Sequence, residues 1–289
     1  MPDRGARTMH RPPVGGAGPV VLIGGAEDKL KARRVLTRFM TLAGGREARI
    51  AVVSTASMFG ERTLETYRSV FDELGAAHVV GLDPHERHEA EAPEMATALV
   101  DATGVFLTGG NQLRLTSVVA GTRLGNAIAL AHDRGAVVAG TSAGASALAG
   151  HMLAFGDTGA TPRHGHVQVA AGLGLVPGVI VDQHFEQRTR LGRLLAAISQ
   201  SPSLIGLGLD EDTAAIVYAD RSMEVVGRGA ITIVDGSQIR TDAYRIKGRK
   251  PMMVSGAMLH SIPAGYWFDL RRRALFAGEA TGEVREASE

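Results

Sequence analysis

The chain has 289 residues, of which 45 % are hydrophobic and 21 % charged, and its formal net charge is +1 at neutral pH. These values are typical of a globular protein with a sizeable core, while the small net charge and the 4 % aromatic content argue against a nucleic-acid-binding surface. The sequence has no cysteine and no run of about 18 apolar residues, which excludes disulfides, cysteine nucleophiles and cysteine metal sites and predicts no membrane-spanning helix.

The two ends of the chain read differently from its body. Residues 1–18 combine arginines, prolines and glycines without the apolar segment of a signal peptide, so we expect a disordered arm and a cytoplasmic protein. No linker interrupts residues 19–280, which we expect to form one α/β domain, and residues 281–289 are expected to form a frayed tail.

Apolar strands alternate with helical periodicity through the first half of the chain. The expected strands are 20–23, 49–54, 78–82, 105–107 and 136–139, and the expected helices are 28–42, 61–74, 93–101 and 113–134, the last in two pieces. Strands that are apolar on both faces predict a mostly parallel, doubly wound sheet with helices on both sides, a three-layer α/β sandwich. Ligands of such sheets bind at the carboxyl ends of the strands.

The pattern changes in the second half. From about residue 204, short alternating runs predict antiparallel strands and hairpins that continue the sheet to its edge: 214–218, 223–226, 231–234, 252–254 and 258–261. Residues 151–178 are rich in glycine and polar groups, and we expect them to form a loop over the site.

The most informative motif follows the fifth expected strand. Residues 140–144 read Gly-Thr-Ser-Ala-Gly, a full G-x-S-x-G pattern between a buried strand and a run of small helix formers. Flanking glycines permit a sharp turn that lifts one hydroxyl clear of the sheet, so Ser142 is a candidate nucleophile. The alternative is a Gly/Ala-rich turn whose serine only caps the helix.

A nucleophilic serine requires a base and an acid that orients the base. His184 ends an apolar run and is the candidate base; the alternative is a core histidine with a satisfied ring. Asp210, Glu211 and Asp212 end another apolar run and offer a carboxylate, unless they form a solvated acidic turn. The order serine, histidine, acid differs from that of α/β-hydrolases.

Three arginines follow the candidate base on an expected helix at 186–199. Arg190 and Arg193 share one helix face, whereas Arg188 points away from them. Arginine pairs bidentately with carboxylates, which favours an acidic substrate; the alternative is a solvated basic helix surface.

Five segments together resemble the cyanophycinase family, over about residues 19–277. They are Gly-Gly-Ala-Glu-Asp-Lys at 24–29, Phe-Leu-Thr-Gly-Gly-Asn-Gln at 106–112, Gly-Thr-Ser-Ala-Gly-Ala at 140–145, Asp-Gln-His-Phe at 182–185 with its arginines, and Gly-Leu-Asp-Glu-Asp-Thr-Ala at 208–214. The Asp-Gln-His-Phe segment with its arginines distinguishes this family from its relative, the aspartyl dipeptidase peptidase E.

The resemblance implies a homodimeric serine exopeptidase, without cofactor or metal, that releases β-Asp-Arg dipeptides from cyanophycin, a poly-aspartate with arginine on each side-chain carboxyl. Ser142 would be the nucleophile, His184 the base and Glu211 the acid, with Asp182 as a rival acid. The substrate pocket would use Gln112, Asp182, Gln183, Arg188, Arg190 and Arg193.

Attack of the serine on an amide carbon would create an oxyanion. We expect the backbone N–H of Ala143 and that of Gly110 or Asn111 to stabilise it. Two positions depart from the family pattern: Ala26 stands where glycine is usual and Asn111 where aspartate is usual, so the turn and the pocket charge are expected to differ. The alternatives are a dipeptidase of the peptidase E type and a non-catalytic binding protein on the same scaffold.

Overall fold

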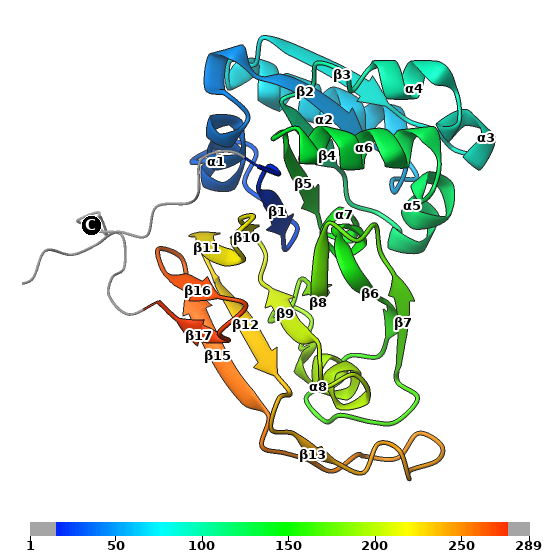
Figure 1. Cartoon of the computed structure of the whole chain (residues 1–289), viewed down its shortest axis with the longest axis vertical. Helices are drawn as coiled ribbons and strands as arrows, with labels where there is room; N and C mark the ends of the chain where they lie inside the picture. Colours follow the sequence, from blue (N-terminus) through cyan, green and yellow to red (C-terminus); the bar gives the residue numbers. More distant parts are fainter. Residues whose placement is uncertain (1–15, 277–289) are drawn as a thin grey trace, which may run out of the picture.

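The structure, a computed structural model, describes residues 16–276 (Figure 1). The expected tail at 281–289 and all but the last three residues of the expected arm at 1–18 therefore lie outside the described residues. Within the described range the chain builds two large sheets and one two-stranded ribbon.

The first sheet has nine strands in the described part of the chain, in the order β17-β16-β11-β10-β1-β5-β4-β2-β3. Five of them are parallel: β1 (Val20–Ile23), β2 (Arg49–Val53), β3 (His78–Leu82), β4 (Gly104–Leu107) and β5 (Val137–Thr141). An antiparallel edge extends the sheet beyond β1: β10 (Thr213–Val217), β11 (Ser222–Gly227), β16 (Trp267–Asp269) and β17 (Ala274–Leu275).

Helices cover both faces of this sheet, because its strands are apolar on both sides. On one face, α1 (Arg34–Leu42) and α2 (Gly60–Glu73) pack Phe39 and Phe71 against Phe106 of β4. The helices that contribute to the core on the other face include α4 (Pro93–Thr97), α5 (Gln112–Val119), α6 (Arg123–Asp133) and α7 (Ala143–Leu148). The predicted α/β fold with helices on both faces is confirmed.

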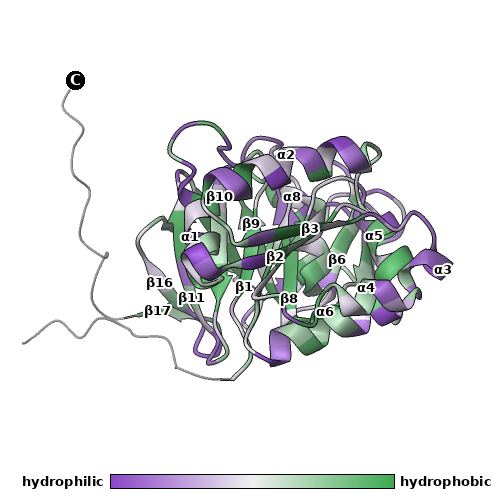
Figure 2. Cartoon of the chain, turned by 90° about the horizontal axis from the view of Figure 1, so that it is seen from above, coloured by the Kyte–Doolittle hydropathy of each residue, from purple (hydrophilic) through white to green (hydrophobic). Residues whose placement is uncertain are grey.

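Hydropathy follows this layering. Figure 2 shows largely hydrophobic strands in the interior and hydrophilic stretches on peripheral helices such as α2 and the short α3 (Arg87–Ala90). No helix of residues 16–276 has the length and apolar character that a bilayer crossing requires.

A second sheet packs against the first, and the sequence did not predict it. Its order is β15-β12-β9-β8-β6-β7, comprising β6 (Ala149–Gly156), β7 (Val167–Ala171), β8 (Val176–Gln183), β9 (Ile205–Leu209), β12 (Ala230–Asp235) and β15 (Met258–Pro263). Val181 and Leu207 on its inner side share a core with Leu22 of β1, and α8 (Leu191–Gln200) covers its outer side through Leu194 and Ile198.

Two expectations for the second half are therefore corrected. Residues 151–178 contain strands rather than only a loop, and the runs at 231–234 and 258–261 join the second sheet instead of continuing the first. Alternation of apolar residues predicts that a strand exists but not which strand it pairs with. The remaining expected strand, at 252–254, overlaps β14 (Val254–Ser255), which forms the separate two-stranded ribbon with β13 (Arg240–Thr241).

Two helices also begin later than predicted. The helix expected at 28–42 starts at Arg34, because the Asp28 carboxylate accepts the four backbone N–H groups of residues 30–33 and wraps them into a turn. These donors, that of Lys31 foremost, hold the pKa of Asp28 well below its usual range. The helix expected at 186–199 starts at Leu191, after a turn that follows β8.

Candidate active site

The G-x-S-x-G motif forms a sharp elbow between β5 and α7. Ser142 has φ 51° and ψ −109°, a conformation that side-chain-bearing residues rarely adopt. A Cβ on Gly140 would lie 2.4 Å from the carbonyl carbon of Gly144, and one on Gly144 would lie 2.4 Å from the carbonyl oxygen of Leu107. Both glycines are therefore required for the close approach that brings the Ser142 hydroxyl above the sheet.

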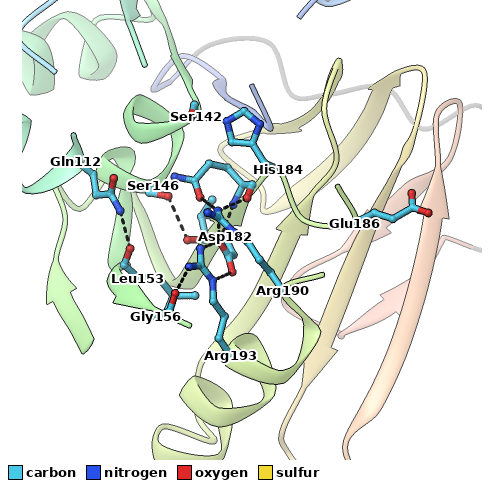
Figure 3. A network of polar contacts seen from close by, with 12 residues as sticks. Gln112, Ser142, Ser146, Leu153, Gly156, Asp182, His184, Glu186, Arg190 and Arg193 are labelled. Carbon is cyan, nitrogen blue, oxygen red and sulfur yellow. Dashed lines mark hydrogen bonds and ion pairs between the residues drawn. The ribbon is translucent and has the colours of Figure 1, made fainter. Parts of the chain in front are cut away.

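The elbow serine, a histidine and a glutamate form a continuous hydrogen-bonded relay. His184 directly follows β8, and its Nε2 lies 2.9 Å from the Ser142 Oγ (Figure 3). Its Nδ1 lies 2.6 Å from Oε1 of Glu211, which follows β9 by two residues. An ionised carboxylate only accepts hydrogen bonds, so Nδ1 carries the proton and donates it to Glu211, and Nε2 is left free to accept the serine O–H. This arrangement can make a hydroxyl nucleophilic.

The imidazole lies in a partly buried, electropositive environment. The His184 side chain is 12 % exposed, and the Glu211 side chain is 37 % exposed. Burial is the main cause of a lowered pKa of His184; the charges of Arg188 and Arg190 lower it further, against the opposing hydrogen bond to Glu211. The ring is therefore neutral at neutral pH and available as a base.

The carboxyl end of β1 connects the three segments that carry this relay. The successive carbonyls of Ile23, Gly24 and Gly25 each accept one backbone hydrogen bond. The donors are, in that order, the N–H groups of Ser142, His184 and Asp212, each at 2.9 Å. Gly25 also lies against the imidazole, since a Cβ there would come within 2.4 Å of His184 Cε1. The sequence identifies this glycine pair only as part of the family motif at 24–29 and does not predict this connecting role.

Two of the three expected oxyanion donors remain free. The N–H groups of Gly110 and Ala143 have no acceptor among residues 16–276, whereas the N–H of Asn111 donates to the Ala56 carbonyl at 2.8 Å. The Asn111 side chain instead caps α5 by accepting the N–H of Arg114. The expectation that Asn111 supplies an oxyanion donor is thus corrected in favour of Gly110.

Asp182 is the centre of a buried ion-pair network (Figure 3). Its side chain is fully buried, and both oxygens are occupied by protein donors: Arg193 Nε at 2.6 Å, Arg193 Nη2, Arg190 Nη1 at 3.1 Å and the Gln183 N–H at 2.9 Å. Asp182 therefore does not replace Glu211 beside His184, which corrects the role of rival acid considered for it.

Of the remaining predicted pocket residues, Gln183, Arg190 and Arg193 are buried, Gln112 is half-buried, and Arg188 is exposed. Arg190 binds the Gln183 side chain at 2.7 Å, Arg193 binds the carbonyl of Gly156 at 2.9 Å, and Gln112 binds the carbonyl of Leu153 at 2.8 Å. Burial lowers the pKa of Arg190 to about 10, so its guanidinium stays charged at neutral pH.

Arg188 differs from the other two arginines, because it is exposed and its guanidinium has no partner among the residues that the structure describes. It is the predicted pocket arginine best placed to receive a ligand carboxylate.

The sequence model of Peptidase family S51 matches residues 20–226. This chain belongs to that family. It is 39 % identical to the cyanophycinase of Trichormus variabilis (strain ATCC 29413 / PCC 7937), over 95 % of this chain and 93 % of the relative, and 39 % identical to the cyanophycinase of Geminocystis herdmanii (strain PCC 6308), over 90 % and 96 %. A crystal structure of a peptidase from an acI-B1 Actinobacterium shares the fold with a TM-score of 0.64 and 22 % identity, over 88 % of this chain and 98 % of that chain.

As a member of family S51 the chain is a serine-type peptidase that resembles cyanophycinases. The structure adds a feature that sequence reasoning missed: a cavity of about 560 Å³, lined in part by Glu186, Arg190, Asp210 and Thr232 but not by the three relay residues. The Glu186 carboxylate is exposed and has no partner within residues 16–276 (Figure 3). The sequence position of Glu186, between the predicted base and the arginines, was the signal that could have marked it as a candidate site residue.

Proposed function

We propose that this S51 peptidase is a serine exopeptidase of the cyanophycinase type, which cleaves Asp–Asp backbone amides of cyanophycin and releases β-Asp-Arg dipeptides. The observation that supports this most directly is the Ser142–His184–Glu211 relay, with the unpaired guanidinium of Arg188 close enough to perturb the imidazole. The similarity to cyanophycinases along nearly the whole chain supports the choice of substrate.

The chemistry follows from the geometry of the relay. His184 Nε2 takes the hydroxyl proton as the Ser142 oxygen attacks the amide carbon, and the N–H groups of Gly110 and Ala143 hold the oxyanion. The imidazolium, stabilised by Glu211, then protonates the leaving amine as the amide C–N bond breaks. Water, deprotonated by His184, hydrolyses the ester intermediate. Removing one oxyanion donor typically raises such a barrier by about 2.7–4 kcal/mol.

The charges around the relay suit the charges of this substrate. A β-Asp-Arg unit carries a carboxylate and a guanidinium, and a free Arg188 is complementary to the first. Because the Asp182 carboxylate is fully buried and already paired, the guanidinium requires another carboxylate. Glu186, which lines the 560 Å³ cavity, is exposed and has no partner within residues 16–276. We therefore assign Arg188 and Glu186 as the groups that distinguish this zwitterionic substrate from an uncharged peptide.

The decisive experiment incubates the purified protein with insoluble cyanophycin and identifies the released products by mass. We expect dipeptides from the wild type, none from Ser142→Ala, and wild-type yields from Ser117→Ala, an exposed serine on α5. Hydrolysis by Ser142→Ala would refute the nucleophile. Cleavage of short aspartyl or isoaspartyl peptides with no action on the polymer would instead assign a dipeptidase of the peptidase E type.

The acid is tested separately. Glu211→Gln should lower kcat strongly, because the variant loses the charge that stabilises the imidazolium. Loss of the chemical step in Asp182→Asn alone, with Glu211→Gln unaffected, would contradict the assignment.

We also propose a homodimer, as the resemblance implies, and a cytoplasmic location, as the residues of the N-terminal segment suggest. Light scattering coupled to size-exclusion chromatography measures the mass directly, and a monomer at working concentrations would refute the dimer.

A further inference from the structure

A buried carboxylate outside the relay lies directly behind the nucleophile elbow. Glu27 follows β1, and its side chain is 1 % exposed. Its carboxylate accepts the Thr141 hydroxyl at 2.6 Å, the Lys29 ammonium at 2.8 Å and the Tyr67 hydroxyl. A buried charge is tolerated only when it is paired and hydrogen-bonded, and these three donors meet that condition.

Thr141 connects this carboxylate to the reacting atom. It is the last residue of β5 and immediately precedes Ser142, whose strained backbone persists only where its surroundings restrain it. One restraint is the hydrogen bond from the Ser142 N–H to the Ile23 carbonyl. The Thr141 side chain is buried, and its only hydrogen bond among residues 16–276 is the one to Glu27. Both restraints originate in the same turn at the end of β1.

We propose that Glu27 is a positioning residue for the nucleophile: by fixing the Thr141 hydroxyl it orients the elbow so that the Ser142 Oγ stays within hydrogen-bond distance of His184 Nε2. The inference rests on the proposed function only in taking Ser142 as the nucleophile.

A carboxylate is the group that this position requires. Two hydroxyl donors converge on it, and an ionised carboxylate accepts from both without presenting a proton of its own. Burial, and secondarily the Glu27 charge, raise the pKa of Tyr67 well above its ordinary value, so its hydroxyl remains a donor. A glutamine side chain keeps only one accepting oxygen, so one hydroxyl loses its acceptor.

The test measures acylation of Ser142 by a fluorophosphonate probe, per folded molecule, together with kcat and KM on cyanophycin. Glu27→Gln and Thr141→Val should lower the acylation rate constant and kcat by ~10–100-fold, with KM changed less than about twofold, because the elbow is displaced while the pocket is intact. Thr141→Ser keeps the hydroxyl and should stay within about threefold of the wild type.

Thr55→Val is the matched control. Thr55 follows β2, is fully buried, and its hydroxyl has no partner in the described part of the chain, so its variant should acylate at the wild-type rate. If Glu27→Gln does not fold, the Thr141 pair decides alone.

Wild-type acylation of folded Thr141→Val, or an equal loss in Thr141→Ser, would overturn the positioning role. A wild-type enzyme that does not react with the probe would instead refute Ser142 as the nucleophile. Acylation without cyanophycin hydrolysis would refute only the proposed substrate.

Discussion

Gly25 offers the most direct test of the site geometry, because it touches the imidazole. It has φ +98°, and a Cβ built on it lies 2.4 Å from His184 Cε1 and 2.6 Å from Nε2. Gly25→Ala therefore adds one methyl group that overlaps the imidazole of His184, without altering any reacting atom.

The expected effect follows from two distances. Carbon atoms in contact rest at about 3.5 Å, so the ring must retreat by about 1 Å. The 2.9 Å contact between Ser142 Oγ and His184 Nε2 then stretches beyond hydrogen-bond range. A displacement of that size costs about 100-fold in rate. The positive φ adds about 1–2 kcal/mol of strain to the folded state.

A matched control separates the two effects. Gly44 has φ +107°, and a Cβ there meets nothing closer than 3.9 Å, so Gly44→Ala introduces the strain without the clash. Both variants should lose similar stability in urea denaturation, but only Gly25→Ala should lose fluorophosphonate reactivity and kcat. If folded Gly25→Ala reacts like Gly44→Ala, the relay geometry described above is wrong.

Three further predictions follow from charges and backbone conformation. Arg188→Gln removes a positive charge that lowers the pKa of His184, so the acidic limb of the kcat/KM profile should move to higher pH, while Arg188→Lys should leave it in place; an unmoved limb in both contradicts the coupling. Ala26→Gly relieves a φ of 48° and should raise the free energy of unfolding by about 0.5–1 kcal/mol, whereas an unchanged denaturation midpoint would refute the strain. Asp182→Asn leaves the two arginines that bind its carboxylate uncompensated and should destabilise the fold by ~3–5 kcal/mol while folded molecules still react with a fluorophosphonate; normal stability would show that the network is not a structural support.

The parallel strands were predictable almost to the residue. β1 is a buried apolar run that ends at a glycine pair, and β3 is a half-buried edge strand that ends at a polar turn; the structure keeps the expected bounds of both. β6 was not predictable in the same way, because its glycines and the exposed His151 interrupt the alternation and imitate a loop. β7 is a short strand with no buried residue, so it lacks an apolar signal of its own. A strand whose partners lie far away in sequence carries no local sign of that pairing.

Local pattern also limited what could be inferred about the site. Ser142 and His184 stand at strand ends, where such residues reach the active edge, so their proximity could be expected. The contacts of Asp182 could not be expected in this way, because nothing in the sequence shows that two arginines at the start of α8 bind its carboxylate. Glu27 was likewise hidden, because an acidic residue beside Lys29 in a turn looks solvated until Tyr67 and Thr141 fold over it.

The hydrogen bonds at the carboxyl end of β1 bear on when a newly synthesised chain can become active. Ser142 belongs to the first sheet, whereas His184 and Glu211 lie at the ends of strands of the second, and the carbonyls at the end of β1 join all three segments. A ribosome-bound chain that stops before residue 211 has its elbow serine but lacks the glutamate that orients the imidazole. We therefore expect hydrolytic capacity only after nearly three quarters of the 289-residue polypeptide has emerged and its sheets have docked.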